Sequence, residues 1–227
     1  MVAPLGGAEG QLTWVKICGL TRPEDAEHAA RSGADALGIV FAASPRQLDI
    51  ERASEILGVV PARVARVGVF ADQPLEFVQE VARVCCLDWV QLSGHESAEL
   101  AAALSANVIK AVHVRDVDDL EAARSYPAQA FLLDAPVMHG RLGGTGSSFD
   151  WSLADRLPWP RHELIVAGGL TPDNVGAAID RLRPGGVDVS SGVESSPGIK
   201  DRSKIDAFMA AVREADTRLR AASGHAS

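Results

Sequence analysis

Short apolar runs alternate with amphipathic stretches along almost the whole chain. Eight of these runs are too short for helices, and several are apolar throughout, which is typical of parallel strands covered on both faces. The predicted strands are Trp14–Cys18, Ala36–Phe41, Ala65–Phe70, Trp89–Leu92, Val108–Val112, Phe131–Leu133, Leu164–Ala167 and Val187–Val189. Eight such strand-then-helix units predict a (β/α)8 barrel with parallel strands, as in TIM barrels. An open, doubly wound sheet is the competing arrangement, because alternation alone does not reveal closure.

The stretches between the strands carry recognisable helix signals. Thr21 and Glu24 have the spacing of a capping box, with Pro23 in the first turn. Thr171 is predicted to cap another helix, with Pro172 as its first residue. A further helix has an apolar face, expected to pack on the barrel, at Ile205, Phe208, Met209 and Val212.

The organisation of the chain is that of a single domain. No linker rich in Ser, Gly or Pro divides residues 1–227, and barrels of this kind routinely use about 200–250 residues as one unit. Only residues 1–10 and 221–227 look like flexible ends.

Composition narrows the class of protein. Hydrophobic residues are 47% and charged residues 23% of the chain, which is globular, and the net charge of −8 excludes a general nucleic-acid binder. An anionic small substrate stays possible, because a local site can oppose the global charge. Three cysteines, two of them the adjacent Cys85 and Cys86, fit a reducing compartment, and both of these are expected in the core. Without a signal peptide or an apolar run of about 18 residues, the protein is predicted to be cytoplasmic and free of membrane.

Barrels of this type keep their active sites at the carboxyl ends of the strands, and loops after the seventh and eighth strands often bind phosphate. Gly168 and Gly169 follow the seventh predicted strand, and their main chain can approach a ligand closely because they lack side chains. The eighth strand is followed by further main-chain donors at Ser190, Ser191 and Gly192. Taken singly, such glycines can equally serve tight turns, but two consecutive loops favour a phosphate site.

Two strand ends carry groups suited to proton transfer. Cys18 ends the first strand two residues after Lys16, although a lone cysteine is usually a small buried hydrophobe. Asp134 ends the sixth strand, where a carboxylate needs a role or a partner, such as a cap or a salt bridge. Arg46 follows the second strand, and its planar fork suits a carboxylate, although most loop arginines are simply solvated.

Other chemistries lack their motifs. The segment from Gly143 to Gly146 does not become a dinucleotide fingerprint, because Phe149 stands where its last glycine belongs. The six histidines form no H-E-x-x-H motif and no G-x-S-x-G elbow exists, so neither a metal nor a cofactor is expected.

Read in order, the strand ends resemble the phosphoribosylanthranilate isomerase family of tryptophan biosynthesis. The likeness runs from Val15 to Asp201, and its ordered set of short motifs is far more specific than any one of them. The segments are Val15–Thr21 (VKICGLT), Ser44–Arg46 (SPR), Val67–Phe70 (VGVF), Gly143–Gly146 (GGTG), Phe149–Trp151 (FDW), Ala167–Leu170 (AGGL), Asp188–Glu194 (DVSSGVE) and Pro197–Asp201 (PGIKD).

The resemblance implies an Amadori rearrangement without cofactor or metal. The family converts N-(5′-phosphoribosyl)anthranilate, an aminoaldose, into the aminoketose 1-(2-carboxyphenylamino)-1-deoxyribulose 5-phosphate. By position, Cys18 corresponds to the general base and Asp134 to the general acid, while Arg46 and Asp188 are expected to bind substrate. Gly144 joins the expected phosphate-binding residues.

Two departures and two rival functions accompany this interpretation. The chain has Ser93 where the family usually has histidine, and its loop between Phe41 and Arg46 is a residue short. A related phosphosugar aldose–ketose isomerase is one alternative, but the histidine-pathway enzyme uses two aspartates where this chain offers Cys18. A non-catalytic phosphosugar-binding barrel is the other, although the chain keeps both Cys18 and Asp134. The expected partner is a small phosphorylated anion, and the expected assembly a monomer or homodimer.

Overall fold

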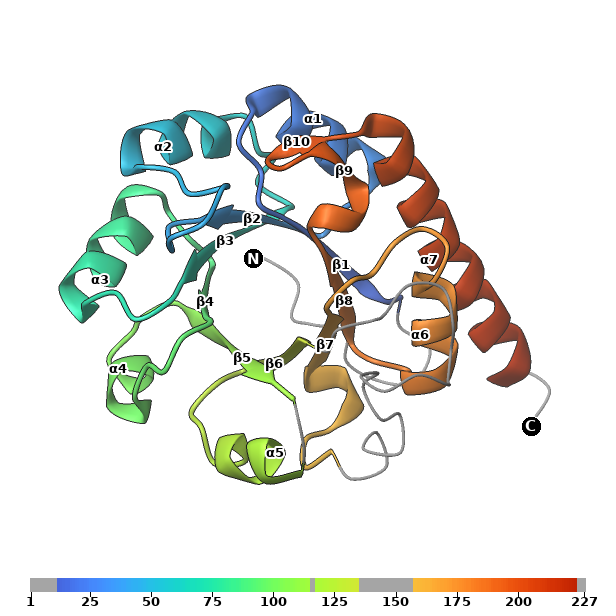
Figure 1. The fold of residues 1–227 in the computed structure, drawn as a ribbon. Coiled ribbons are helices and arrows are strands. Elements are labelled where there is room, and N and C mark those ends of the chain that lie inside the picture. Colours follow the sequence, from blue (N-terminus) through green and yellow to red (C-terminus); the bar gives the residue numbers. More distant parts are fainter. Residues whose placement is uncertain (1–11, 115–116, 135–156, 224–227) are drawn as a thin grey trace.

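The structure, a computed structural model, describes residues 12–114, 117–134 and 157–223. Its eight main strands close into one ring in the order β1 to β8, and each strand runs parallel to its neighbours. Figure 1 looks into this ring, with the helices arranged around its outside. The predicted closed barrel is therefore confirmed, and the open sheet is wrong because β8 pairs with β1.

The observed strands agree with the apolar runs to within a residue at either end. Their bounds are β1 Trp14–Cys18, β2 Ala36–Val40, β3 Ala65–Phe70, β4 Trp89–Leu92, β5 Asn107–His113, β6 Ala130–Asp134, β7 Leu164–Ala167 and β8 Gly186–Val189. A two-stranded hairpin follows β8, made of β9 Glu194–Ser196 and β10 Ile199–Lys200.

The helices lie in the connections between strands, except for the last helix, which follows the last strand. They are α1 Pro23–Ser32, α2 Ile50–Gly58, α3 Leu75–Val84, α4 Ala98–Ala102, α5 Val117–Ala123, α6 Val175–Leu182 and α7 Arg202–Ser223, with short 3-10 turns η2 Arg161–Glu163 and η3 Ser191–Val193. In α7, the predicted apolar face is buried at Ile205, Phe208, Met209 and Val212.

The first predicted capping box is wrong. Arg22, not Thr21, occupies the N-cap of α1, and no side chain caps that helix. The Thr21 hydroxyl instead donates to the main-chain oxygen of Gly198 at 2.5 Å, which ties the start of α1 to the β9–β10 hairpin. A local motif is overridden here by a hydrogen bond to a residue far along the chain.

The second predicted cap is wrong as well, since α6 begins at Val175 rather than at Pro172. The main-chain N–H of Thr171 donates to Asn174 Oδ1 at 2.8 Å. That bond holds residues 171–174 in a turn, so the helix starts one turn later than the sequence indicates.

Two further expectations need correction. Cys85 is buried as predicted, but Cys86 is exposed, because it lies past the C-cap of α3 with a φ of 48° that turns the chain away. At the C-terminus, α7 continues to Ser223, so residues 221–223 are helical rather than a loose end. Residues 1–10 lie outside the described part of the chain.

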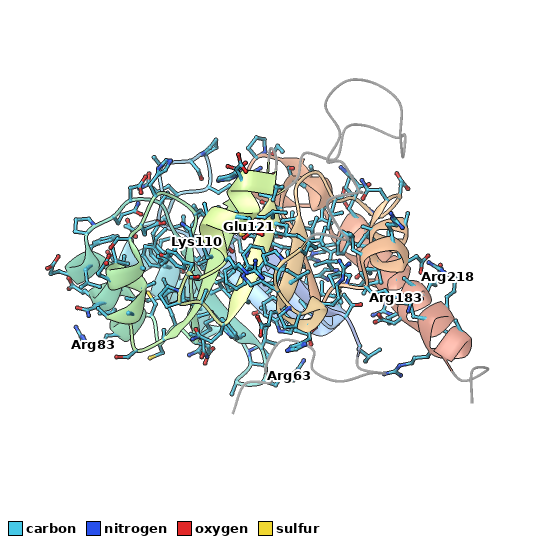
Figure 2. All side chains as sticks on the ribbon, turned by 90° about the horizontal axis from the view of Figure 1, so that it is seen from below. Arg63, Arg83, Lys110, Glu121, Arg183 and Arg218 are labelled. Atoms are coloured by element: carbon cyan, nitrogen blue, oxygen red, sulfur yellow. The ribbon has the colours of Figure 1, made fainter. Side chains whose placement is uncertain are left out.

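Alternate strand residues point into the barrel or out toward the helices, as the period of a strand requires. An apolar layer fills the interior, with Trp14, Val67, Trp89, Ile109 and Ile165 among its buried members. Figure 2 shows the barrel from the side, with Arg63 and Arg83, which precede β3 and β4, toward one edge. Toward the opposite end, where the strands finish, buried positions become polar at Lys16, Gln91 and Asp188. The candidate site lies at this end of the barrel.

Candidate active site

A pocket of about 270 Å³ opens at the carboxyl ends of the strands. The described residues that line it come from β4 to β8 and the loops that follow them: Gln91, Ser93, Ala111, His113, Leu132, Asp134, Ala167, Gly168, Gly169, Leu170, Asp188, Val189, Ser190, Ser191 and Gly192. Asp134, Asp188 and the predicted phosphate-binding residues of the last two loops are thus brought together. Gly144 lies outside the described residues.

The two predicted phosphate loops lie side by side in the lining of the pocket. Gly168 and Gly169 have φ values of 86° and 68°, a left-handed conformation that glycine adopts without strain. A side chain at Gly192 would lie 1.8 Å from the main-chain oxygen of Leu170, so the two loops touch through their backbones. At Gly168, Gly169 and Gly192 no side chain stands between the main chain and a ligand, so the N–H groups of these loops can serve as anion donors, together with the hydroxyls of Ser190 and Ser191.

Cys18 lies beside a buried charge pair instead of on the pocket wall. Lys16 Nζ donates to Asp188 Oδ1 at 2.9 Å, and the Lys16 side chain has no exposed surface. Gly38, on the neighbouring strand, makes room for the thiol, since a β-carbon there would lie 2.8 Å from Cys18 Sγ. Asp188 also lines the pocket, so it joins the buried pair to the open cavity.

Burial and charge act in opposite directions on these groups. Burial raises the pKa of the Cys18 thiol, and the positive charge of Lys16 offsets only part of that effect. For Lys16, burial alone would lower the pKa, but attraction to Asp188 and Cys18 raises it above its usual value. Lys16 is therefore a charged ammonium, and its positive charge favours a Cys18 thiolate.

Asp134 stands at the pocket wall with a histidine next to it. Its side chain is 43% exposed, and Oδ2 lies 3.3 Å from Nδ1 of His113, the last residue of β5. The two are register partners on adjacent strands, and both side chains line the pocket.

Arg46 is engaged by a carboxylate of the protein itself. Its Nε and Nη2 donate to the two oxygens of Glu194 at 2.7 and 2.5 Å. Lys200 donates to the same carboxylate at 2.8 Å, and together these cations lower the pKa of Glu194 to about 2 against the opposing effect of burial. A guanidinium has five N–H donors, so Glu194 leaves as many as three for another anion. Arg46 is not among the described residues that line the pocket.

The comparisons with known proteins agree with this architecture. Residues 15–211 match the family described as N-(5′-phosphoribosyl)anthranilate (PRA) isomerase. The chain belongs to the phosphoribosylanthranilate isomerase family. N-(5′-phosphoribosyl)anthranilate isomerase from Rubrobacter xylanophilus is 48% identical over 204 residues, 88% of this chain and 98% of the relative. The Pelobacter propionicus isomerase is 46% identical over 203 residues, 88% of this chain and 95% of the relative.

Solved structures of the family have the same fold. The phosphoribosyl anthranilate isomerase of Thermotoga maritima matches with a TM-score of 0.79 and 42% identity over 89% of this chain and 100% of its own. A phosphoribosyl anthranilate isomerase in complex with reduced 1-(o-carboxyphenylamino)-1-deoxyribulose 5-phosphate matches with a TM-score of 0.78 and 41% identity over the same shares. The resemblance seen in the strand-end motifs is confirmed.

Several residues at or beside the site were not predicted from the sequence. Glu194 and Lys200 lay within the matching motifs but received no role, and no local pattern reveals that they meet Arg46. Lys16 had a visible signal, a lysine within a buried apolar strand. His113 and Gln91 were missed, although both are polar residues near the ends of apolar strands.

Neither a metal cluster nor a membrane-spanning helix is found among the described residues. Within residues 12–114, 117–134 and 157–223, no group of three or more His, Cys, Asp or Glu side chains is arranged to hold a metal ion. None of the helices in those ranges combines the length and apolarity needed to cross a bilayer.

Proposed function

We propose that this protein converts N-(5′-phosphoribosyl)anthranilate to 1-(2-carboxyphenylamino)-1-deoxyribulose 5-phosphate in tryptophan biosynthesis, with Cys18 as general base and Asp134 as general acid. The observation that carries the proposal is one shared pocket. Asp134 and the two phosphate loops line it, and its Asp188 is bonded to Lys16, the lysine beside Cys18. An acid, a base and an anion site are the groups that an Amadori rearrangement of a phosphosugar requires.

The reaction begins with proton transfer to the substrate. Asp134, in its carboxylic acid form, protonates the furanose ring oxygen, the C1′–O bond breaks, and the nitrogen lone pair forms the C1′–N double bond of a Schiff base. The half-exposed position of Asp134 at the pocket wall suits this role, because its carboxyl can reach a bound sugar.

The second proton transfer occurs at C2′. A Cys18 thiolate removes the C2′ proton, the electron pair moves toward the nitrogen, and the resulting enolamine tautomerises to the ketone. The base role requires a thiolate in a buried place, and Lys16 supplies the compensating charge. Asp188, bound to Lys16 and facing the cavity, is suited to hold a sugar hydroxyl on the same side.

The two anionic ends of the substrate fix its direction. We place the phosphate on the main-chain N–H groups of Gly168, Gly169, Ser190, Ser191 and Gly192, and add Gly144 from the resemblance. The carboxylate of the anthranilate then points toward Arg46, which follows the second strand. The net charge of −8 fits an enzyme that acts on a small molecule better than a nucleic-acid binder.

Turnover of N-(5′-phosphoribosyl)anthranilate by the purified full chain tests the proposal, because anthranilate fluorescence falls as product forms. Cys18→Ala and Asp134→Asn should each lower kcat by about 10²–10⁴-fold, the typical cost of losing a positioned proton-transfer group. Cys86→Ser and Asp206→Asn are matched controls, since both residues are exposed and lie outside the pocket lining.

The outcomes separate the parts of the proposal. No turnover by the wild-type protein with this substrate would overturn the function itself. Near-normal kcat in a folded Cys18→Ala or Asp134→Asn variant, with product confirmed by mass, would leave the function in place and reject that residue's role.

A further inference from the structure

The end of β5 carries an imidazole that the proposed chemistry does not use. His113 is the last residue of that strand, and its register partner on β6 is Asp134. Partners in register on adjacent strands project to the same face of the sheet, and this face is the interior of the barrel. Both side chains accordingly line the pocket.

The contact between them is direct. His113 Nδ1 lies 3.3 Å from Asp134 Oδ2, while His113 Nε2 lies 3.4 Å from the main-chain oxygen of Ser93 at the end of β4. The imidazole therefore bridges from the β4 loop to the carboxyl on β6. Its side chain is 63% exposed, so packing does not require it, and burial does not fix the 43% exposed carboxyl of Asp134.

We propose that His113 is a positioning residue for Asp134. The inference rests on the proposed role of Asp134 as general acid. A half-exposed aspartate can occupy several rotamers, and a general acid must hold its oxygen within hydrogen-bonding reach of the atom it protonates. Contact with the imidazole at Oδ2 limits that rotation. We therefore assign proton donation to the other oxygen, Oδ1.

The structure offers an internal comparison for this contact. His95 and Asp72 form a similar pair at the same end of the barrel, with Nδ1 and Oδ2 3.4 Å apart, and His95 has a 98% exposed side chain. Neither residue lines the described pocket. Loss of the His95 imidazole therefore removes an equivalent surface contact without touching the site.

Four variants test the assignment: His113→Ala, His113→Asn, Asp134→Asn and the double variant His113→Ala/Asp134→Asn. We expect His113→Ala to lower kcat by about 10–100-fold, the scale of a misplaced catalytic group, with KM changed less than threefold. His113→Asn should restore most of the kcat, because its amide can reach the place of Nδ1. His95→Ala should match wild type, and the melting temperatures of all variants should agree.

The double variant decides whether His113 acts through Asp134. In the Asp134→Asn background, loss of His113 should cost almost nothing more, because no acid is left to position. A full and additive further loss, or a wild-type kcat in His113→Ala, would overturn the positioning role. A wild-type kcat in Asp134→Asn would instead reject the acid role of Asp134, so the two failures are distinguishable.

Discussion

Lys16 and Asp188 are paired in register across β1 and β8, and their ammonium and carboxylate groups meet at 2.9 Å inside the barrel. These two strands close the ring, so the salt bridge spans the joint between the first and the last strand. The ammonium is buried completely and lies next to Cys18, while the carboxylate reaches the pocket. One pair thus serves both the closure of the fold and the electrostatics of the proposed base.

Removing one partner of this pair should be costly. Lys16→Met leaves Asp188 buried without its cation, and we expect the free energy of unfolding to fall by about 3–5 kcal/mol in urea titrations. Lys16→Met/Asp188→Leu should be less destabilised than Lys16→Met, because two apolar side chains replace both charges. A double variant less stable than Lys16→Met would contradict this account of the pair.

Arg46 should affect one end of the substrate only. Arg46→Ala is expected to lower kcat/KM by about 10–100-fold, since a charge-assisted pair with a carboxylate contributes about 1.5–3 kcal/mol. Binding of inorganic phosphate, measured by calorimetry, should hardly change, because we place that anion at the opposite end. Equal losses for both ligands would locate Arg46 in the phosphate site or the scaffold, and no loss for either would make it a structural partner of Glu194.

The glycines after β7 should be necessary for the phosphate. Gly169 has a φ of 68°, so Gly169→Val strains the backbone and places a side chain at the pocket wall. We expect KM for the substrate to rise at least tenfold, about 1.4 kcal/mol, with weaker binding of a phosphorylated product analogue. Gly58→Val is the matched control, since a β-carbon at that helical position meets no atom within 4 Å. Unchanged affinity in a folded Gly169→Val variant would count against this phosphate site.

Glu194 should make the fold sensitive to acid. Arg46 and Lys200 hold the pKa of its carboxyl at about 2 in the folded protein, compared with 4.5 for the unperturbed group. Because the folded pKa is depressed, the resulting stability is fully present above about pH 4.5 and is lost as pH falls toward about 2.

Glu194→Gln tests this dependence. The difference in unfolding free energy between wild type and Glu194→Gln should be largest near pH 7 and should shrink as pH falls from about 5 to about 2. Urea titrations at a series of pH values give the comparison. A difference that stays constant over that range would show that titration of Glu194 does not control it.

Much of the fold could be predicted from the sequence because its signals are local. An apolar run such as Ala36–Val40 is buried on one face by the barrel interior and on the other by the surrounding helices. Each strand can therefore be recognised from its own residues, without knowledge of the strands beside it. The same logic located Asp134 and Gly168–Gly169, since a polar residue or a glycine pair directly after such a run lies at the carboxyl mouth. The local rule failed at Thr21, whose hydroxyl bonds Gly198 instead of capping its helix.

The partners of the site residues were decided only by the tertiary structure. Lys16 meets Asp188 across 172 positions of sequence, and Arg46 meets Glu194 across 148. Such contacts follow from closure of the barrel and from the register of β1 against β8, and no periodicity in a single segment encodes either. His113 and Asp134 likewise become partners through the β5–β6 register. Sequence determined which residues stand at the mouth of the barrel, and the closed ring of strands decided which of them touch.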